Sequence, residues 1–185
     1  MQVKIIPALV FAGAAAASQV AFAADGTITF TGSVTSQTCT VVTKDFTVTL
    51  PPVSAASLNA GGLTAGATAF NIKLKDCAPL KDDNTKGDVA IKSVHAYFEN
   101  GPTTDVSGNL NLDPGDAANV QVQLLNGSDQ SPIKLGLSDA SQGATNVPVN
   151  PDGTATLPFY ARYYATGAAG AGKVSTKVVY TIAYQ

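Results

Sequence analysis

The chain has 185 residues, of which 45% are hydrophobic and 13% charged, and its formal net charge is −2 at pH 7. Soluble domains usually carry roughly 25% charged residues, so this chain is unusually poor in charge. Without an excess of lysine and arginine, the composition speaks against a nucleic-acid-binding protein. A surface with so little charge suits a protein that packs against copies of itself, although it is equally compatible with a monomer.

Residues 1–23 have the features of a secretory signal peptide. Lys4 supplies a positive start, an apolar run follows over 5–17, and Ala21 and Ala23 place small residues where signal peptidase requires them. The apolar run is too short to span a bilayer. We therefore expect cleavage after Ala23 and no membrane span in the remaining chain.

The remaining chain contains two cysteines, Cys39 and Cys77. In the oxidising compartment to which a signal peptide leads, such a pair is expected to form one disulfide. A metal site would need more ligands than these two thiols and His95. We therefore expect no metal and no other cofactor.

The stretch 26–34, GTITFTGSV, alternates strictly between two kinds of residue. Successive side chains of a strand point to opposite faces, so this stretch is predicted to be a strand with an apolar stripe and a hydroxyl-bearing stripe. We assign it to an N-terminal arm over 24–36, ahead of a domain over 37–185. The apolar stripe consists of Ile28, Phe30, Gly32 and Val34.

The rest of the chain reads as many short strands separated by turn residues, with no sustained helical period. One short helical turn is expected at 54–58, within a loop over 54–68, and Asn126-Gly127 is expected to form a hairpin turn. Pro158 should place its strand end at an edge or bulge. This pattern predicts an all-β sandwich, with strands at 38–42, 46–50, 70–74, 89–98 (a central strand), 110–112, 120–125, 133–137, 155–165 and 177–185.

No arrangement of side chains in the sequence indicates catalysis. His95 lies in an apolar strand without an evident partner, so we expect a buried histidine and no enzyme activity. Asp82, Asp83 and Asp88 do not have the spacing of an EF-hand and are expected in a solvated loop. Asn126-Gly127-Ser128 matches a glycosylation sequon, but its composition is already explained by the turn.

The last strand resembles the arm, because it also alternates and it runs to the final residue. An uncovered edge of this kind favours pairing with another strand. Pairing with its own arm would close the sandwich, whereas pairing with the arm of another copy would build a head-to-tail chain. The residues alone do not choose between these. The apolar stripe consists of Val178, Tyr180, Ile182 and Tyr184.

Several stretches together resemble a major subunit of type 1-like fimbriae assembled by the chaperone–usher route. They are GTITFTGSVTSQTC, LPPVSAASL, FNIKLKDC, PFYARYYATGAAG and a terminal strand with penultimate Tyr184. Gly172 also stands at the distance from the C-terminus that the terminal motif of this family has. The resemblance covers nearly all of the chain after the signal peptide and is weakest over 79–152.

The resemblance implies an incomplete immunoglobulin-like sandwich that lacks its last strand. A periplasmic chaperone would lend a strand to the groove, and at an outer-membrane usher the arm of the next subunit would replace it. By position, Ile28, Phe30, Gly32 and Val34 would enter the neighbour's groove. The groove and chaperone-binding strand would comprise Gly172, Val178, Tyr180, Ile182 and Tyr184, and the subunit's disulfide would join Cys39 and Cys77.

The leading hypothesis is therefore a structural subunit of a surface fimbria that supports cell adhesion and polymerises with related subunits. A minor or adaptor subunit of the same fibre has the same layout. A monomeric secreted β-sandwich that binds a sugar or a protein is the alternative, with the arm as its own edge strand. These hypotheses differ in whether the chain is stable alone.

Overall fold

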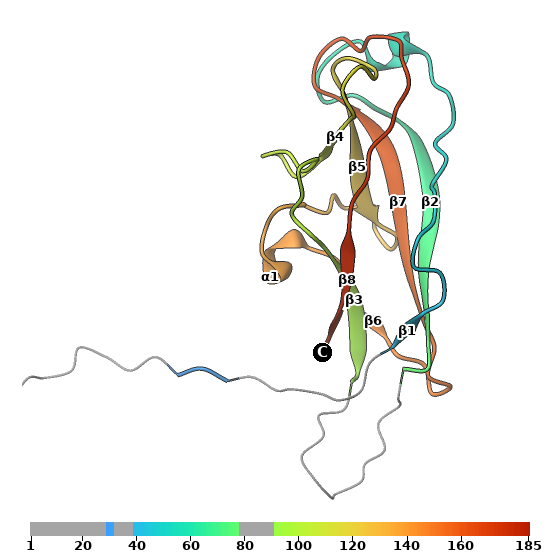
Figure 1. Cartoon of the computed structure of the whole chain (residues 1–185), viewed down its shortest axis with the longest axis vertical. Coiled ribbons are helices and arrows are strands. Elements are labelled where there is room, and N and C mark those ends of the chain that lie inside the picture. Colours follow the sequence, from blue (N-terminus) through green and yellow to red (C-terminus); the bar gives the residue numbers. More distant parts are fainter. Residues whose placement is uncertain (1–28, 32–38, 78–90) are drawn as a thin grey trace, which may run out of the picture. The chain divides into compact units, whose positions relative to one another are not determined.

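The computed structural model describes residues 29–31, 39–77 and 91–185. Within these ranges the regular structure is almost entirely β-strand, arranged in two sheets (Figure 1). The exceptions are the 3-10 helix η1 (Ala55–Leu58) and the short helix α1 (Asp139–Gln142). The predicted all-β, two-sheet architecture is confirmed. Neither helix is long and apolar enough to cross a membrane.

The larger sheet is antiparallel, with its long strands at the centre and two-residue strands at both edges. Short edge strands limit pairing with other chains. In spatial order the strands are β1 (Thr40–Val41), β2 (Thr64–Lys75), β7 (Ala155–Ala165), β5 (Val120–Asn126) and β4 (Leu110–Asn111).

The smaller sheet has three strands, in the order β6 (Val147–Pro148), β3 (Ser93–Phe98) and β8 (Tyr180–Tyr184). The prediction of a central strand near 89–98 is confirmed, because β3 pairs on both sides. β8 pairs with β3 on one side only. The C-terminal strand of the described chain is therefore an edge strand.

The core lies between the two sheets and is built from the inward side chains of both. Val94, Ala96 and Phe98 of β3 face it, and all three are buried. The ring of Phe98 meets Phe159 of β7 edge-on, with centroids 5.3 Å apart. Aromatic pairs in this geometry add to the free energy gained from burial alone. This contact joins the centre of one sheet to the centre of the other.

A polar network covers the outer face of β5. Gln121 and Gln123 point away from the core but are buried, because the loop over 101–109 folds against them. The Gln121 amide donates to Asp105 Oδ2 at 2.8 Å, and the Gln123 amide donates to Asn109 Oδ1 at 3.0 Å. Arg162 donates to Gln123 Oε1 from both Nε and Nη2. Each buried amide therefore has a partner, as burial requires.

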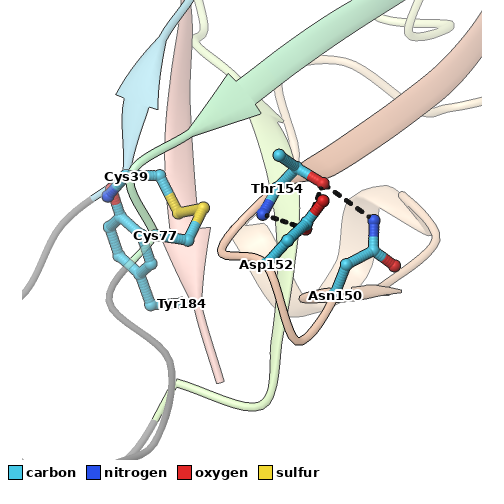
Figure 2. Close-up of a disulfide and its surroundings, with 6 residues drawn as sticks. All are labelled: Cys39, Cys77, Asn150, Asp152, Thr154 and Tyr184. Atoms are coloured by element: carbon cyan, nitrogen blue, oxygen red, sulfur yellow. Dashed lines mark hydrogen bonds between the residues drawn. A yellow bond between two sulfur atoms is a disulfide. The ribbon is translucent and has the colours of Figure 1, made fainter.

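The disulfide Cys39–Cys77 ties the start of β1 to the end of β2 (Figure 2). The N–H of Cys77 donates to the carbonyl of Gly153, in the turn that leads into β7. The Asp152 carboxylate holds this turn by accepting from the N–H and the hydroxyl of Thr154. The hydroxyl and the N–H of Thr154 lower the pKa of Asp152, because both bonds favour the ionised carboxylate.

The prediction of an Asn126-Gly127 hairpin turn is wrong in its details. The loop is longer, since Asn126 N–H donates to the Ser131 carbonyl, and the positive φ in it belongs to Gln130. Gly127 is needed for a different reason: a Cβ there would lie 2.4 Å from the Cβ of Pro158. The return segment 133–137 contacts β5 through Ile133 N–H but forms no strand.

Pro158 sits in β7, which is a central strand and not the predicted edge. Its carbonyl accepts from Gly127 N–H, so its nitrogen also faces β5. β5 ends at Asn126, opposite Phe159. The missing N–H of the proline therefore costs no ladder bond, because the partner strand has already ended.

The predicted bounds of the remaining elements agree with the structure in some cases and differ in others. β7 matches the predicted 155–165, and η1 lies within the predicted 54–58. β2 begins at Thr64, inside the stretch expected to be loop, with a register shift between Ala65 and Thr68. The predicted strand at 46–50 has no sheet partner in the described chain. The signal peptide and the loop with Asp82, Asp83 and Asp88 lie outside the described residues.

Replacing Gly153 with alanine should destabilise the domain strongly. Gly153 has φ +76°, and a Cβ there would lie 2.7 Å from the Cys77 carbonyl oxygen. Strain at positive φ costs about 1–3 kcal/mol, and the clash adds to it. The matched control is Gly143→Ala, since Gly143 has φ +77° and nothing within 4 Å of its Cβ position. Urea unfolding should show the larger loss for Gly153→Ala, and equal losses would contradict this explanation.

Candidate functional site

A groove of about 1320 Å³ opens along one edge of the sandwich. One wall is formed by residues 44–53, which follow β1, and the other by residues 169–180, which lead into β8. The floor consists of apolar core residues, among them Phe70, Ile72, Phe98, Val122, Leu124 and Ala161. Core side chains are thus reachable from outside between two segments from opposite ends of the domain.

The C-terminal wall directs half of its backbone groups into the groove. The carbonyls of Lys173, Ser175 and Val179 accept bonds from the loops and strands on the far side. Backbone groups alternate in direction along a strand, so those of Val174, Thr176 and Val178 face the groove. Their N–H groups have no partner among the described residues.

The N-terminal wall is unpaired in the same way. Over 46–50 no backbone N–H bonds to any described residue. Val48 and Leu50 are half-buried and pack against the core, while Thr47 and Thr49 are exposed. The predicted alternation of this segment is therefore real, and its ladder is missing because no neighbouring strand lies beside it.

The two walls and the floor fit one kind of ligand, an extended peptide. Backbone donors and acceptors that are withdrawn from water need partners. A strand placed between the walls would supply these partners on both of its sides. Its alternate side chains would cover the apolar floor.

The structure brings together the predicted residues of the terminal strand. Val178, Tyr180, Ile182 and Tyr184 are half-buried and pack against the core, whereas Val179 between them is 68% exposed. Val178 and Tyr180 line the groove. Tyr180 donates its hydroxyl to the Lys44 carbonyl at 3.1 Å, and Tyr184 accepts from the Cys39 N–H at 3.1 Å. Burial and the charge of Asp45 raise the pKa of Tyr180.

Gly172 lies at the end of the groove where the terminal segment meets the loop before β5. A Cβ at this position would lie 2.8 Å from the backbone nitrogen of Ala117 and 2.9 Å from its Cα. Ala117 donates its N–H to the neighbouring Lys173 carbonyl. Gly172 is therefore required by the close approach of two backbones.

Of the predicted arm residues, only Phe30 falls within the described chain, and its side chain is 89% exposed. Ile28, Gly32 and Val34 lie outside the described residues. Their roles stay predictions.

His95 is buried, as predicted, but the expectation that it has no partner is wrong. Its Nε2 lies 2.7 Å from Oδ1 of Asp139 on α1. The pair holds α1 against the outer face of β3, and Gln142 adds bonds to the N–H and carbonyl of Phe98. No group of three or more potential metal ligands occurs in the described ranges.

Sequence reasoning found the terminal wall of the groove but missed the opposite wall. The sequence predicts a short strand at 46–50 and does not assign it to a groove. The only signal was the alternation of Phe46, Val48 and Leu50, which does not reveal whether a neighbour is present. The residues of the floor could not be assigned to a groove, because a core position looks the same whether it is covered or open.

The comparisons with known proteins agree with one another. A family model described as FimA, type-1 fimbrial protein A, matches residues 50–185. The chain is 47% identical over 176 residues to the F17 fimbrial protein of Escherichia coli, covering 93% of this chain and 94% of that protein. It is 46% identical over 179 residues to the major fimbrial subunit SMF-1 of Stenotrophomonas maltophilia, covering 92% and 98%.

Solved structures show the same fold. The P pilus rod subunit PapA superposes with a TM-score of 0.59 at 16% identity, over 80% of this chain and 99% of that one. A subunit in the structure of a chaperone–usher pilus gives a TM-score of 0.57 at 18% identity, over 88% and 96%. At these identities the likeness concerns the fold alone.

Gly172→Ala should distort the end of the groove and destabilise the domain. The added methyl group must push the terminal segment away from Ala117, and overpacking of this kind typically costs about 1–3 kcal/mol. The control is Gly167→Ala, whose Cβ would have its nearest neighbour at 3.5 Å, an ordinary contact. Thermal unfolding of both variants measures the difference. A Gly172→Ala variant as stable as the control would refute the close approach.

Proposed function

This chain belongs to the FimA family of type-1 fimbrial proteins, as a structural and non-enzymatic subunit of chaperone–usher pili on the cell surface, and from this premise we propose how it joins its neighbours. The groove of one subunit accepts the N-terminal arm of the next as an additional β-strand. Repetition of this step builds a fibre head to tail, without closure.

One observation carries the proposal: in the described chain, the backbone groups that both walls direct at the groove have no partner, and the floor between them is apolar. The free N–H groups of Val174, Thr176 and Val178 face the unpaired segment 46–50 across the groove. One strand satisfies both walls at once. This arrangement supports a peptide ligand over a sugar or a small molecule, because a backbone ladder is what the walls lack.

The arm has the pattern that such a groove requires. Ile28, Phe30 and Val34 would each gain about 1.5–3 kcal/mol on full burial. Ordering about ten residues of backbone costs about 1–2 kcal/mol per residue, which exceeds that gain. The remaining free energy of binding must come from hydrogen bonds to the groove walls and from covering the open core. Both walls are therefore essential. Gly32 would face a place where no side chain fits.

The open groove also explains why the subunit would need a chaperone before assembly. An uncovered edge above an exposed core promotes aggregation. We propose that a periplasmic chaperone covers the groove with a strand of its own, and that an outer-membrane usher is where the arm replaces it. The route via the periplasm requires the signal peptide over 1–23.

Among fimbrial subunits we propose the repeating subunit of the shaft. Both a donor arm and an acceptor groove are needed at every position within a shaft, and this chain has the sequence of the one and the geometry of the other. The likeness to SMF-1, which is named a major fimbrial subunit, supports this choice. The chain is also 34% identical over 174 residues to the minor fimbrial subunit HifD of Haemophilus influenzae, which keeps an adaptor position as the second candidate.

Gly32→Leu should block assembly while chaperone binding stays normal, because the change affects the donated strand and not the groove. The control is Thr31→Leu, one residue earlier on the hydroxyl-bearing stripe, which should still assemble. Fibre length and yield, seen by electron microscopy beside the amount of chaperone–subunit complex, measure the outcome. Normal fibres from Gly32→Leu would show that the register proposed for the arm is wrong.

Val178→Asp should abolish acceptance of an arm, because the carboxylate would be desolvated beneath the inserted strand. Val179→Asp is the matched control: its side chain is exposed on the other face of the same segment. A peptide of residues 24–36 provides the probe, and its binding to the mature subunit can be followed by fluorescence anisotropy. We expect at least a tenfold loss for the first variant and little change for the second. Similar binding by both would place the arm elsewhere.

A further inference from the structure

Two tyrosines of β8 reach across the sandwich to the N-terminal wall segment. Tyr180 donates its hydroxyl to the Lys44 carbonyl, and Tyr184 accepts the N–H of Cys39, each at 3.1 Å. Both stand on the same face of β8, two positions on either side of Ile182. Their rings pack against the core, so only the oxygen atoms extend to the opposite edge.

The Tyr180–Lys44 contact lies at one end of the groove, and the Tyr184–Cys39 contact lies outside the groove lining. Among the described residues, no other hydrogen bond joins the segment 39–53 to the segment 169–185. Farther along, at Val48 and Leu50, the walls are separated by the groove itself. The phenol oxygens are therefore the polar links that hold the two walls to each other.

One link ends on a rigid part of the domain. Figure 2 shows Tyr184 beside the disulfide, with the turn of Asn150, Asp152 and Thr154 next to Cys77. Cys39 is fixed through Cys77, whose N–H bonds to the same turn. The other link, to Lys44, has no covalent support near it. The N-terminal wall is thus fixed at Cys39 and held a second time at Lys44, just before the unpaired stretch begins.

The reach of a tyrosine matches the width that an inserted strand needs. Two strands on either side of a third lie about 10 Å apart, twice the usual spacing. By covalent bond lengths a tyrosine extends about 6.5 Å from Cα to its oxygen. Adding the 3.1 Å hydrogen bond in a straight line gives the greatest possible reach, which is close to this separation. The links can therefore exist in the empty groove and persist once it is filled.

We propose that Tyr180 and Tyr184 are positioning residues whose hydroxyls fix the spacing of the two groove walls at the width of one strand, so that the groove is prepared for an incoming strand. This inference rests on the proposed function, since it concerns the readiness of the same groove. A binding site that is ordered beforehand loses less entropy when its ligand arrives. The ordinary alternative is that the tyrosines serve the core through their rings alone.

The test removes single oxygen atoms and leaves the rings. Tyr180→Phe, Tyr184→Phe and the double variant are compared with Tyr97→Phe, a control on β3, whose neighbour across the ladder is the exposed Thr181. The full mature subunit, released from its chaperone, is mixed with the peptide 24–36. Association rate and affinity are measured, together with hydrogen exchange at the Cys39 amide.

A net hydrogen bond contributes a free energy equivalent to roughly a 2- to 10-fold change in an equilibrium. We expect each single variant to bind the peptide about 2- to 10-fold more weakly, mainly through slower association, and the double variant to lose more. Exchange at Cys39 should accelerate in Tyr184→Phe by a similar factor and stay unchanged in Tyr180→Phe. Tyr97→Phe should match the wild type in both measurements.

Wild-type binding by both single variants, with Cys39 equally protected, would overturn the inference and leave the proposed function intact. Failure of the wild type to bind the peptide would instead reject the proposed function, and this inference with it. If the double variant does not fold, the single variants, each lacking one oxygen atom, still decide.

Discussion

The rest of this structure depends on one unmet requirement: the backbone of the last strand has hydrogen-bond partners on one side only. A buried or partly buried N–H without a partner costs free energy comparable to a lost hydrogen bond. Here the requirement extends from Val174 to Val178 and is mirrored by 46–50 on the opposite wall. In the assembly proposed above, this local deficit becomes a driving force, because an inserted strand removes it.

The remainder of the domain keeps both sheets ordered although the backbone beside the groove is unpaired. Phe98 and Phe159 join the two sheets at their centres, and the disulfide Cys39–Cys77 with its neighbouring turn fixes the N-terminal wall at its start. On the outer side, Gln123 and Arg162 satisfy each other beneath a covering loop. A core left open along one edge therefore coexists with walls that are held in place.

Much of the fold could be predicted from local pattern. β7 followed from its strand-like sequence, the central place of β3 followed from apolar residues on both of its faces, and the disulfide followed from compartment and count. The predictions were wrong where a glycine or a proline serves a purpose other than the one its residue type suggests. Gly127 resembles a turn glycine but is needed for contact with Pro158, and Pro158 is tolerated centrally because β5 ends beside it. The second wall and the floor of the groove could not be predicted, since alternation in 46–50 looks the same with or without a neighbour.

The lengths of the edge strands in the two sheets affect whether subunits can assemble in a line, in a sheet or in a network. β1, β4 and β6 are outer strands of only two residues each, too short to template another chain. β8 and the segment before it form a long edge beside the groove, with the unpaired residues 46–50 on the opposite side. With the groove as acceptor and the arm as donor, as proposed above, each subunit has two connections, one of each kind. Such subunits add in a line and do not spread into sheets or networks, so thread-like order is already contained in the unequal lengths of the edges.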